Sequence, residues 1–219
     1  TRVLPEVTIS ELTPRKRRFF LKYLARFLLL FESVKAKGSF LDNKRVIVTA
    51  APHQSGKDEY LMILMILALD IEVCYLSAKW TMRRIPIPFI KPKDIDNQGI
   101  PWPLGWLQEI VFRKFGAIPV DRKGNSGQYD SVVQELLKRD NFLLIITPEG
   151  RFDATRFRSS FLYLAKELEA EVMPVQIDYE HDTLQFLNSL NLDGSEEEVI
   201  QRLRFCFDGV KGRKSRFKA

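Results

Sequence analysis

Residues 45–58 read Arg-Val-Ile-Val-Thr-Ala-Ala-Pro-His-Gln-Ser-Gly-Lys-Asp, a run of branched apolar residues that ends in proline, glycine and polar residues. This pattern is typical of a buried strand that enters a loop, and the apolar residues 60–69 then predict a buried helix. His53 therefore lies at the end of a predicted strand. In α/β proteins, ligands bind at that end of the sheet.

The strand–loop–helix prediction also places Asp58. In one continuous helix, residues five apart are about 140° apart around the axis, so His53 must precede the helix if it faces Asp58. Ser55 as N-cap with Asp58 at the third helical position resembles a capping box, and the carboxylate can then point back toward the imidazole. An imidazole held in one tautomer by a carboxylate is a general base for a hydroxyl that attacks an acyl carbonyl. The spacing leaves open that Asp58 only caps the helix and that His53 only fills a loop.

A phosphate-binding loop is the rival interpretation of the same stretch, because Gly56 and Lys57 lie between a predicted strand and a predicted helix. That pattern needs another glycine five residues before Gly56, and Ser or Thr after the lysine. Ala51 and Asp58 stand at these two positions. The tight turn and the hydroxyl that holds magnesium are both missing, which disfavours a nucleotide site.

Composition narrows the class of protein and its partners. The 219 residues are enough for one sizeable core, and the net charge of +6 with a pI near 9.3 indicates an acidic partner such as anionic lipid, a phosphorylated substrate or nucleic acid. Cys74 and Cys206 form neither a disulfide framework nor a metal-ligand pattern, which favours a reducing, cytoplasmic location and a metal-free mechanism. The apolar run 60–69 is about half of the roughly 20 residues that span a bilayer.

Strand-like and amphipathic segments alternate along the rest of the chain. Strands are predicted at 71–78, 117–121, 142–147 and 172–178, and helices at 104–114, 126–139, 157–169 and 196–207. This alternation predicts a single α/β domain with a mixed, largely parallel sheet flanked by helices. We place an N-terminal helical segment at 1–40, the main domain at 41–210 and a basic tail at 211–219.

Three further motifs stand at predicted strands: Gly-Ala-Ile-Pro-Val-Asp-Arg at 116–122, Thr-Pro-Glu-Gly-Arg at 147–151 and Val-Met-Pro-Val at 172–175. Together with the His53 motif, they resemble the glycerolipid acyltransferase superfamily, whose best-known members are the 1-acylglycerol-3-phosphate acyltransferases. The likeness covers about residues 45–180. It is closest to the short bacterial members, which carry a proline before the histidine and a Pro-Leu-Gly-Trp like residues 103–106.

The resemblance implies a reaction and a set of roles. A fatty acyl group would pass from acyl-CoA or acyl carrier protein to a hydroxyl of a lysophospholipid such as 1-acylglycerol-3-phosphate, in phospholipid biosynthesis and without a further cofactor or a metal. His53 would be the base and Asp58 its charge partner. Substrate binding would fall to Arg122, which matches the arginine assigned to the acceptor phosphate, and to the third-motif residues Glu149, Gly150 and Arg151. Guanidinium groups suit phosphate, and glycine allows close approach of the backbone.

The third motif departs from the family pattern, which usually reads Glu-Gly-Thr-Arg. Here the threonine is missing, so Arg151 directly follows Gly150. This departure favours, as an alternative, an acyltransferase that acts on a different hydroxylated lipid. A catalytically silent lipid- or nucleic-acid-binding protein would explain the charge but not the pair of His53 and Asp58. Taken singly, Arg122 also fits a solvated strand end, and Glu149 with Arg151 fits a surface ion pair.

Residues 15–31 combine a basic cluster with phenylalanines and leucines in a helical pattern. Phe20 and Phe27 share one face, and Lys22 and Arg26 share the opposite face. One interpretation is a helix that packs its apolar face on the core and leaves its basic face in water. The other is a helix that lies on anionic lipid, which would hold the protein at the cytoplasmic face of the membrane as a peripheral protein.

Overall fold

The computed structural model describes most of the chain between residues 6 and 212. The described residues are 6–9, 19–40, 45–54, 56–68, 73–78, 82–85, 100–101, 103–114, 116–120, 127–149 and 156–212. The chain divides into two compact units, which are residues 1–73 together with 140–219, and residues 74–139. Each unit is described by itself.

The first unit is built on a largely parallel sheet. Its strands follow the spatial order β1 (Glu6–Ile9), β2 (Lys35–Phe40), β10 (Thr183–Phe186), β9 (Glu171–Asp178), β3 (Arg45–Ala51) and β8 (Phe142–Ile146). All neighbours in this order are parallel except β9 and β10, which run antiparallel and are joined by a short turn. A short antiparallel connection needs no crossover helix, whereas the parallel pairs do.

Strand β3 is the centre of this sheet. It is buried from Val46 to Ala51, as expected for a run of branched apolar residues between two parallel partners. Thr49 is in register with Ile146 of β8 and with Pro174 of β9. Because these three strands are parallel, their carboxyl ends meet at one edge of the sheet, and the residues that follow each strand emerge there.

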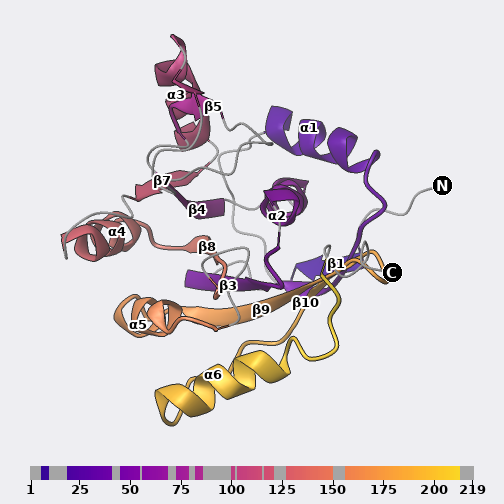
Figure 1. Ribbon diagram of the computed structural model, residues 1–219, viewed down its shortest axis with the longest axis vertical. Helices are drawn as coiled ribbons and strands as arrows, with labels where there is room; N and C mark the ends of the chain where they lie inside the picture. The colour runs from indigo at the N-terminus through magenta and orange to yellow at the C-terminus, as the bar shows by residue number, and fades with distance from the viewer. Residues whose placement is uncertain are drawn as a thin grey trace. The chain divides into compact units, whose positions relative to one another are not determined.

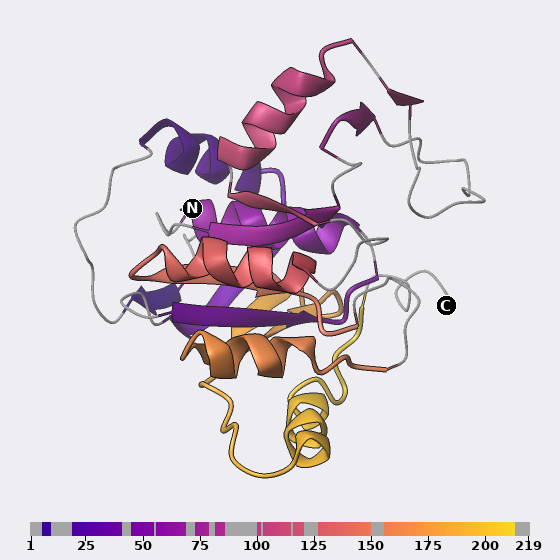
Figure 2. The ribbon, with the colours of Figure 1, turned by 90° about the vertical axis from the view of Figure 1, so that its left-hand side faces the viewer.

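Helices cover both faces of the sheet (Figures 1 and 2). On one face lies α2 (Gly56–Ala68) with α1 (Phe19–Leu29) packed outside it, and on the other lie α5 (Ser160–Glu167) and α6 (Glu196–Phe205). Residues 61–68 of α2 are all apolar, and all of them except Ile63 are buried, as expected for a helix segment that is apolar on every side. Helix α6 begins with a capping box between Ser195 and Glu198.

The second unit contains a smaller parallel pair, β4 (Val73–Ala78) with β7 (Ala117–Val120), and an antiparallel pair, β5 (Arg84–Ile85) with β6 (Ile100–Pro101). Helices α3 (Gly105–Lys114) and α4 (Gly127–Leu137) accompany them. Gly105 starts α3 where a Cβ atom would lie 2.6 Å from the backbone oxygen of Arg83, so the close approach of this backbone requires glycine.

The predicted α/β class with a largely parallel sheet flanked by helices and an N-terminal helix is confirmed. The ends of the elements differ by a few residues: the helix with the apolar run 60–69 begins at Gly56, where Asp58 as third helical residue predicts it, but ends at Ala68. The helix predicted over 157–169 spans 160–167. The sequence did not predict strands β1, β2, β5, β6 and β10. The predicted boundaries at residues 40 and 210 stay predictions.

Candidate active site

His53 and Asp58 come together at the carboxyl end of β3. His53 follows the strand directly and is 5% exposed, while Asp58 is the third residue of α2 and is 1% exposed. His53 Nδ1 lies 3.7 Å from Asp58 Oδ2. The helix starts after the histidine, as predicted, which lets the carboxylate point back toward the ring. The side chain of His53 is therefore packed inside the protein and is not that of an exposed loop residue.

Asp58 binds the loop as well as facing the imidazole. Its Oδ2 accepts a 2.7 Å hydrogen bond from the backbone N–H of Gln54, and its Oδ1 accepts one of 2.6 Å from the hydroxyl of Tyr179. The two predicted roles, capping and orientation of the histidine, are therefore not exclusive. Ser55, the predicted N-cap, lies outside the described residues.

Glu149 holds the loop from the neighbouring strand. It follows β8, is 8% exposed, and its Oε2 accepts a 2.7 Å hydrogen bond from the backbone N–H of His53. Burial raises the pKa of the Glu149 carboxyl, and the hydrogen bond from His53 offsets part of that rise. The observed partner of Glu149 is thus the backbone of the candidate base, and its predicted contact with substrate stays a prediction.

The remaining predicted site residues are Arg122, Gly150 and Arg151. All three lie outside the described residues. Their roles toward the acceptor phosphate stay predictions that rest on the resemblance and on the chemistry of guanidinium and glycine.

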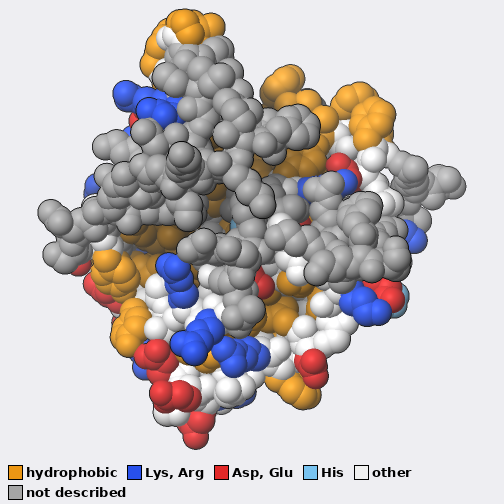
Figure 3. Space-filling view, viewed as in Figure 1, with side chains coloured by type: hydrophobic (Ala, Val, Ile, Leu, Met, Phe, Trp, Pro, Cys, Tyr) orange, Lys and Arg blue, Asp and Glu red, His pale blue; other side chains and the backbone are white. Residues whose placement is uncertain are grey.

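Helix α1 presents its apolar face to solvent. Phe20 is 74% exposed and Phe27 is 55% exposed, whereas Ala25 on the opposite side is buried against the unit. Hydrophobic side chains gather over α1 in Figure 3, and those exposed there are Phe20, Tyr23, Leu24, Phe27, Leu30 and Phe31. Arg26, predicted to lie on a wet basic face, donates a 3.1 Å hydrogen bond to the backbone oxygen of Ala68 at the end of α2. The core-packing interpretation of this helix is therefore wrong for its described residues.

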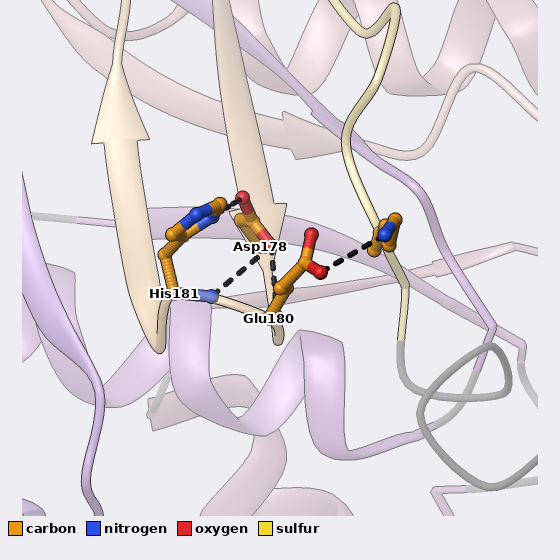
Figure 4. A network of polar contacts seen from close by, with 4 residues as sticks. Asp178, Glu180 and His181 are labelled. Atoms are coloured by element: carbon orange, nitrogen blue, oxygen red, sulfur yellow. Dashed lines mark hydrogen bonds and ion pairs between the residues drawn. The ribbon is translucent and has the colours of Figure 1, made fainter. Parts of the chain in front are cut away.

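A second polar cluster lies on the turn between β9 and β10 (Figure 4). There His181 Nδ1 lies 2.7 Å from Asp178 Oδ2, and Lys211 Nζ lies 2.9 Å from Glu180 Oε1. The hydrogen bond to Asp178 raises the pKa of the His181 imidazole. Asp178, Glu180 and His181 are the ligand-type side chains that converge within 4.8 Å in the part of the chain that the structure describes. These ion pairs already account for the exposed cluster, so it does not by itself indicate a metal site.

The edge of the sheet where His53, Glu149 and Tyr179 meet is built from strands that carry three of the four motifs. Residues 103–178 match the Acyltransferase family. This is the superfamily that the motifs resemble, and the match supports acyl transfer as the general activity. It includes the second, third and fourth motifs and begins after His53 and Asp58. No curated protein matches the chain.

Sequence reasoning did not identify Tyr179 or Gln54, which bind both carboxylate oxygens of Asp58. Gln54 contributes only its backbone N–H, which any residue except proline would supply. Tyr179 is separated from Asp58 by 121 positions and lies in no recognised motif. One feature of the sequence pointed to Tyr179: it directly follows the strand predicted at 172–178. In a parallel sheet, the residue after that strand emerges at the same edge as His53.

Proposed function

We propose that this chain transfers a fatty acyl group from an acyl thioester, acyl-CoA or acyl carrier protein, to a hydroxyl of a lysophospholipid such as 1-acylglycerol-3-phosphate, in phospholipid biosynthesis. The observation that carries the proposal is the buried approach of Asp58 Oδ2 to His53 Nδ1 at the end of β3. The family match over residues 103–178 supports the reaction class.

The chemistry follows from the two nitrogens of the imidazole. With Nδ1 protonated and facing Asp58, Nε2 is the nitrogen that accepts a proton. His53 then deprotonates the acceptor hydroxyl as its oxygen attacks the thioester carbonyl. The carbon–sulfur bond breaks, the ester bond forms, and the imidazolium returns its proton to the departing thiolate. Asp58 stabilises the imidazolium during the step.

An anion site for the acceptor phosphate is the second part of the proposal. Arg122 and Arg151 would supply planar, charged donors that can bind phosphate oxygens in pairs. Support comes from the second and third motifs and from the net charge of +6. The shortened third motif motivates the alternative that the acceptor is another hydroxylated lipid.

Attachment to a membrane surface is the third part. No helix in the described residues is long and apolar enough to cross a bilayer. The exposed face of α1 carries aromatic and aliphatic side chains, and Phe27 and Phe31 meet edge to face at 5.3 Å. Aromatic and aliphatic side chains of this kind insert at the lipid–water boundary, which is where a lysophospholipid is found.

The test is thioester consumption by the purified chain with a panel of acceptors. Acyl-CoA and acyl carrier protein are each offered with 1-acylglycerol-3-phosphate, a lysophosphatidylcholine and a monoacylglycerol, and products are identified by mass spectrometry. The proposal expects acyl transfer with the phosphomonoester as the best acceptor. Preference for the monoacylglycerol would favour the different-lipid alternative. Lipid binding without transfer to any acceptor would favour a silent binding protein and overturn the proposal.

A further inference from the structure

One contact to the candidate pair comes from outside the four motifs. Tyr179 follows β9, is buried with 6% of its surface exposed, and donates its hydroxyl to Asp58 Oδ1 at 2.6 Å. We infer that Tyr179 is a positioning residue, which fixes the Asp58 carboxylate and through it the imidazole of His53. This inference rests on the proposed function, because that function supplies the reaction that the pair serves.

Two donors on opposite oxygens define the orientation of a carboxylate. The backbone N–H of Gln54 binds Asp58 Oδ2, and the hydroxyl of Tyr179 binds Oδ1. With both bonds in place, the carboxylate plane is fixed and Oδ2 stays on the side of His53 Nδ1, 3.7 Å away. Without the hydroxyl of Tyr179, the carboxylate keeps one of these anchors and can rotate about its Cβ–Cγ bond. Preorganisation of this kind is what keeps a base in its productive orientation.

Tyr179 is itself held in place by the chain after α6. Its backbone N–H donates a 3.0 Å hydrogen bond to the backbone oxygen of Lys211. On the outer side of the same turn, the side chain of Lys211 pairs with Glu180, and His181 pairs with Asp178 (Figure 4). The turn is therefore tied to the C-terminal segment on one side and to β9 on the other, which limits the movement of the tyrosine ring.

The chain at residues 211–212 also contacts Gln54, whose backbone N–H is the other donor to Asp58. Gly212 is buried, and a Cβ atom at this position would lie 2.5 Å from Cδ of the Gln54 side chain. Residues 211–212 thus contact the backbone of Tyr179 and the side chain of Gln54, the two residues that bind Asp58. The basic tail predicted at 211–219 begins with residues that belong to the support of the site.

A matched pair of substitutions separates positioning from packing. Tyr179→Phe removes only the hydroxyl and keeps the buried ring. Tyr163→Phe is the control, because its exposed hydroxyl likewise donates to a carboxylate, that of Glu196 at 2.8 Å. Thermal melts of both variants show that the measurements are made on folded protein.

The first readout needs no substrate. The chain has two histidines, so ¹⁵N-histidine labelling gives two imidazole spin systems, which a His181→Asn variant assigns. Tyr179→Phe should lower the share of His53 in the Nδ1-protonated tautomer, while Tyr163→Phe leaves that share unchanged. An unchanged tautomer share in folded Tyr179→Phe would overturn the inference, whether or not the chain transfers acyl groups.

The second readout is the rate of acyl transfer. Loss of a hydrogen bond to a charged group predicts that kcat falls about tenfold or more in Tyr179→Phe, with KM for both substrates changed less than about twofold. Added to Asp58→Asn, the substitution should cause little further loss, because both act through one contact. A kcat equal to that of Tyr163→Phe, or fully additive losses, would contradict positioning. An inactive wild type on every donor and acceptor would instead contradict the proposed function.

Discussion

The Asp58 carboxylate, on the first turn of α2, interacts with three residues in two parts of the first unit: the loop after β3 and the end of β9. It binds the loop through Gln54, the end of β9 through Tyr179, and faces the ring of His53. Charge-assisted hydrogen bonds are the strong ones in proteins, so a buried carboxylate with two donors is held more firmly than a surface cap. His53 and Asp58 are therefore held by the end of strand β9 as well as by the loop after β3.

Glu149 gives a pH-dependent prediction. Burial raises its folded-state pKa above the ordinary value of 4.5, so its ionisation opposes folding. The Glu149 carboxyl therefore contributes most to the free energy of unfolding below pH 4.5, where it is protonated. This contribution is lost as the pH rises through the folded-state pKa. Glu149→Gln keeps an oxygen to accept from the His53 N–H and does not titrate. The free energy of unfolding of this variant, minus that of wild type, should increase with pH.

Urea unfolding of both proteins between pH 4 and pH 8 measures this difference. A difference that stays constant across the range, or that decreases as the pH rises, would contradict the burial of an ionisable Glu149 carboxyl next to His53.

Arg122 and Arg151 give a prediction about the acceptor. Each charge-assisted contact to phosphate contributes about 1.5–3 kcal/mol, so Arg122→Ala and Arg151→Ala should raise KM for 1-acylglycerol-3-phosphate by about tenfold or more. KM for the acyl donor should change much less. Steady-state kinetics with each substrate varied in turn measures both constants, and Arg158→Ala, an arginine outside the proposed set, is the control. Equal effects on donor and acceptor would remove the two arginines from the acceptor site.

At the scale of elements, α1 is attached to its unit by its less apolar side. Ala25 packs inward, and the guanidinium of Arg26 satisfies the backbone oxygen of Ala68, one of the carbonyls left unpaired at the end of α2. The side chain of Lys57 on α2 pairs with Glu32 just beyond α1 at 2.7 Å. This arrangement leaves the side chains of Phe20 and Phe27 exposed, so that they can contact another surface.

The exposed face of α1 predicts binding to anionic vesicles without a role in folding. Phe20→Ser with Phe27→Ser should leave the melting temperature within a few degrees of wild type, because both side chains are exposed. Burial of each phenylalanine contributes about 1.5–3 kcal/mol, so loss of both should weaken vesicle binding more than about 100-fold. Co-sedimentation with phosphatidylglycerol vesicles measures it.

Phe205→Ser is the matched control, because Phe205 on α6 is also exposed and belongs to a different element. It should bind vesicles like wild type. Unfolding of the double α1 variant would restore the core-packing interpretation, and unchanged vesicle binding would leave α1 without the proposed contact to lipid.

Hydrophobic periodicity predicted the helices well but could not orient α1. The pattern of residues 15–31 shows which residues share a face, whereas the buried face depends on the partner, here the end of α2 at Ala68. Strand β2, with lysines at positions 35 and 37 and glycine at 38, carries no apolar alternation, so it was missed although it pairs with β1 and β10. Edge and near-edge strands of this kind are defined by their neighbours and not by their own composition.

At the scale of the whole molecule, the site was predictable where its residues are close in sequence. His53 and Asp58 are five residues apart on a strand, loop and helix, and local rules fix their approach. Glu149 was predicted from its motif, but its contact with the His53 backbone depends on the pairing of β3 with β8. Tyr179 depends in the same way on the pairing of β3 with β9. Such partners follow from sheet order, which a sequence without its fold does not reveal.

The central claim is that His53 is the base of an acyl transfer, and one comparison tests it most directly. Wild type and His53→Gln, which keeps a polar side chain in the buried position, are assayed for transfer from acyl-CoA or acyl carrier protein to 1-acylglycerol-3-phosphate, with melting temperatures measured alongside. Loss of a general base predicts a fall in kcat of about 10²- to 10⁴-fold in a folded variant. Near-wild-type turnover by folded His53→Gln would contradict the claim.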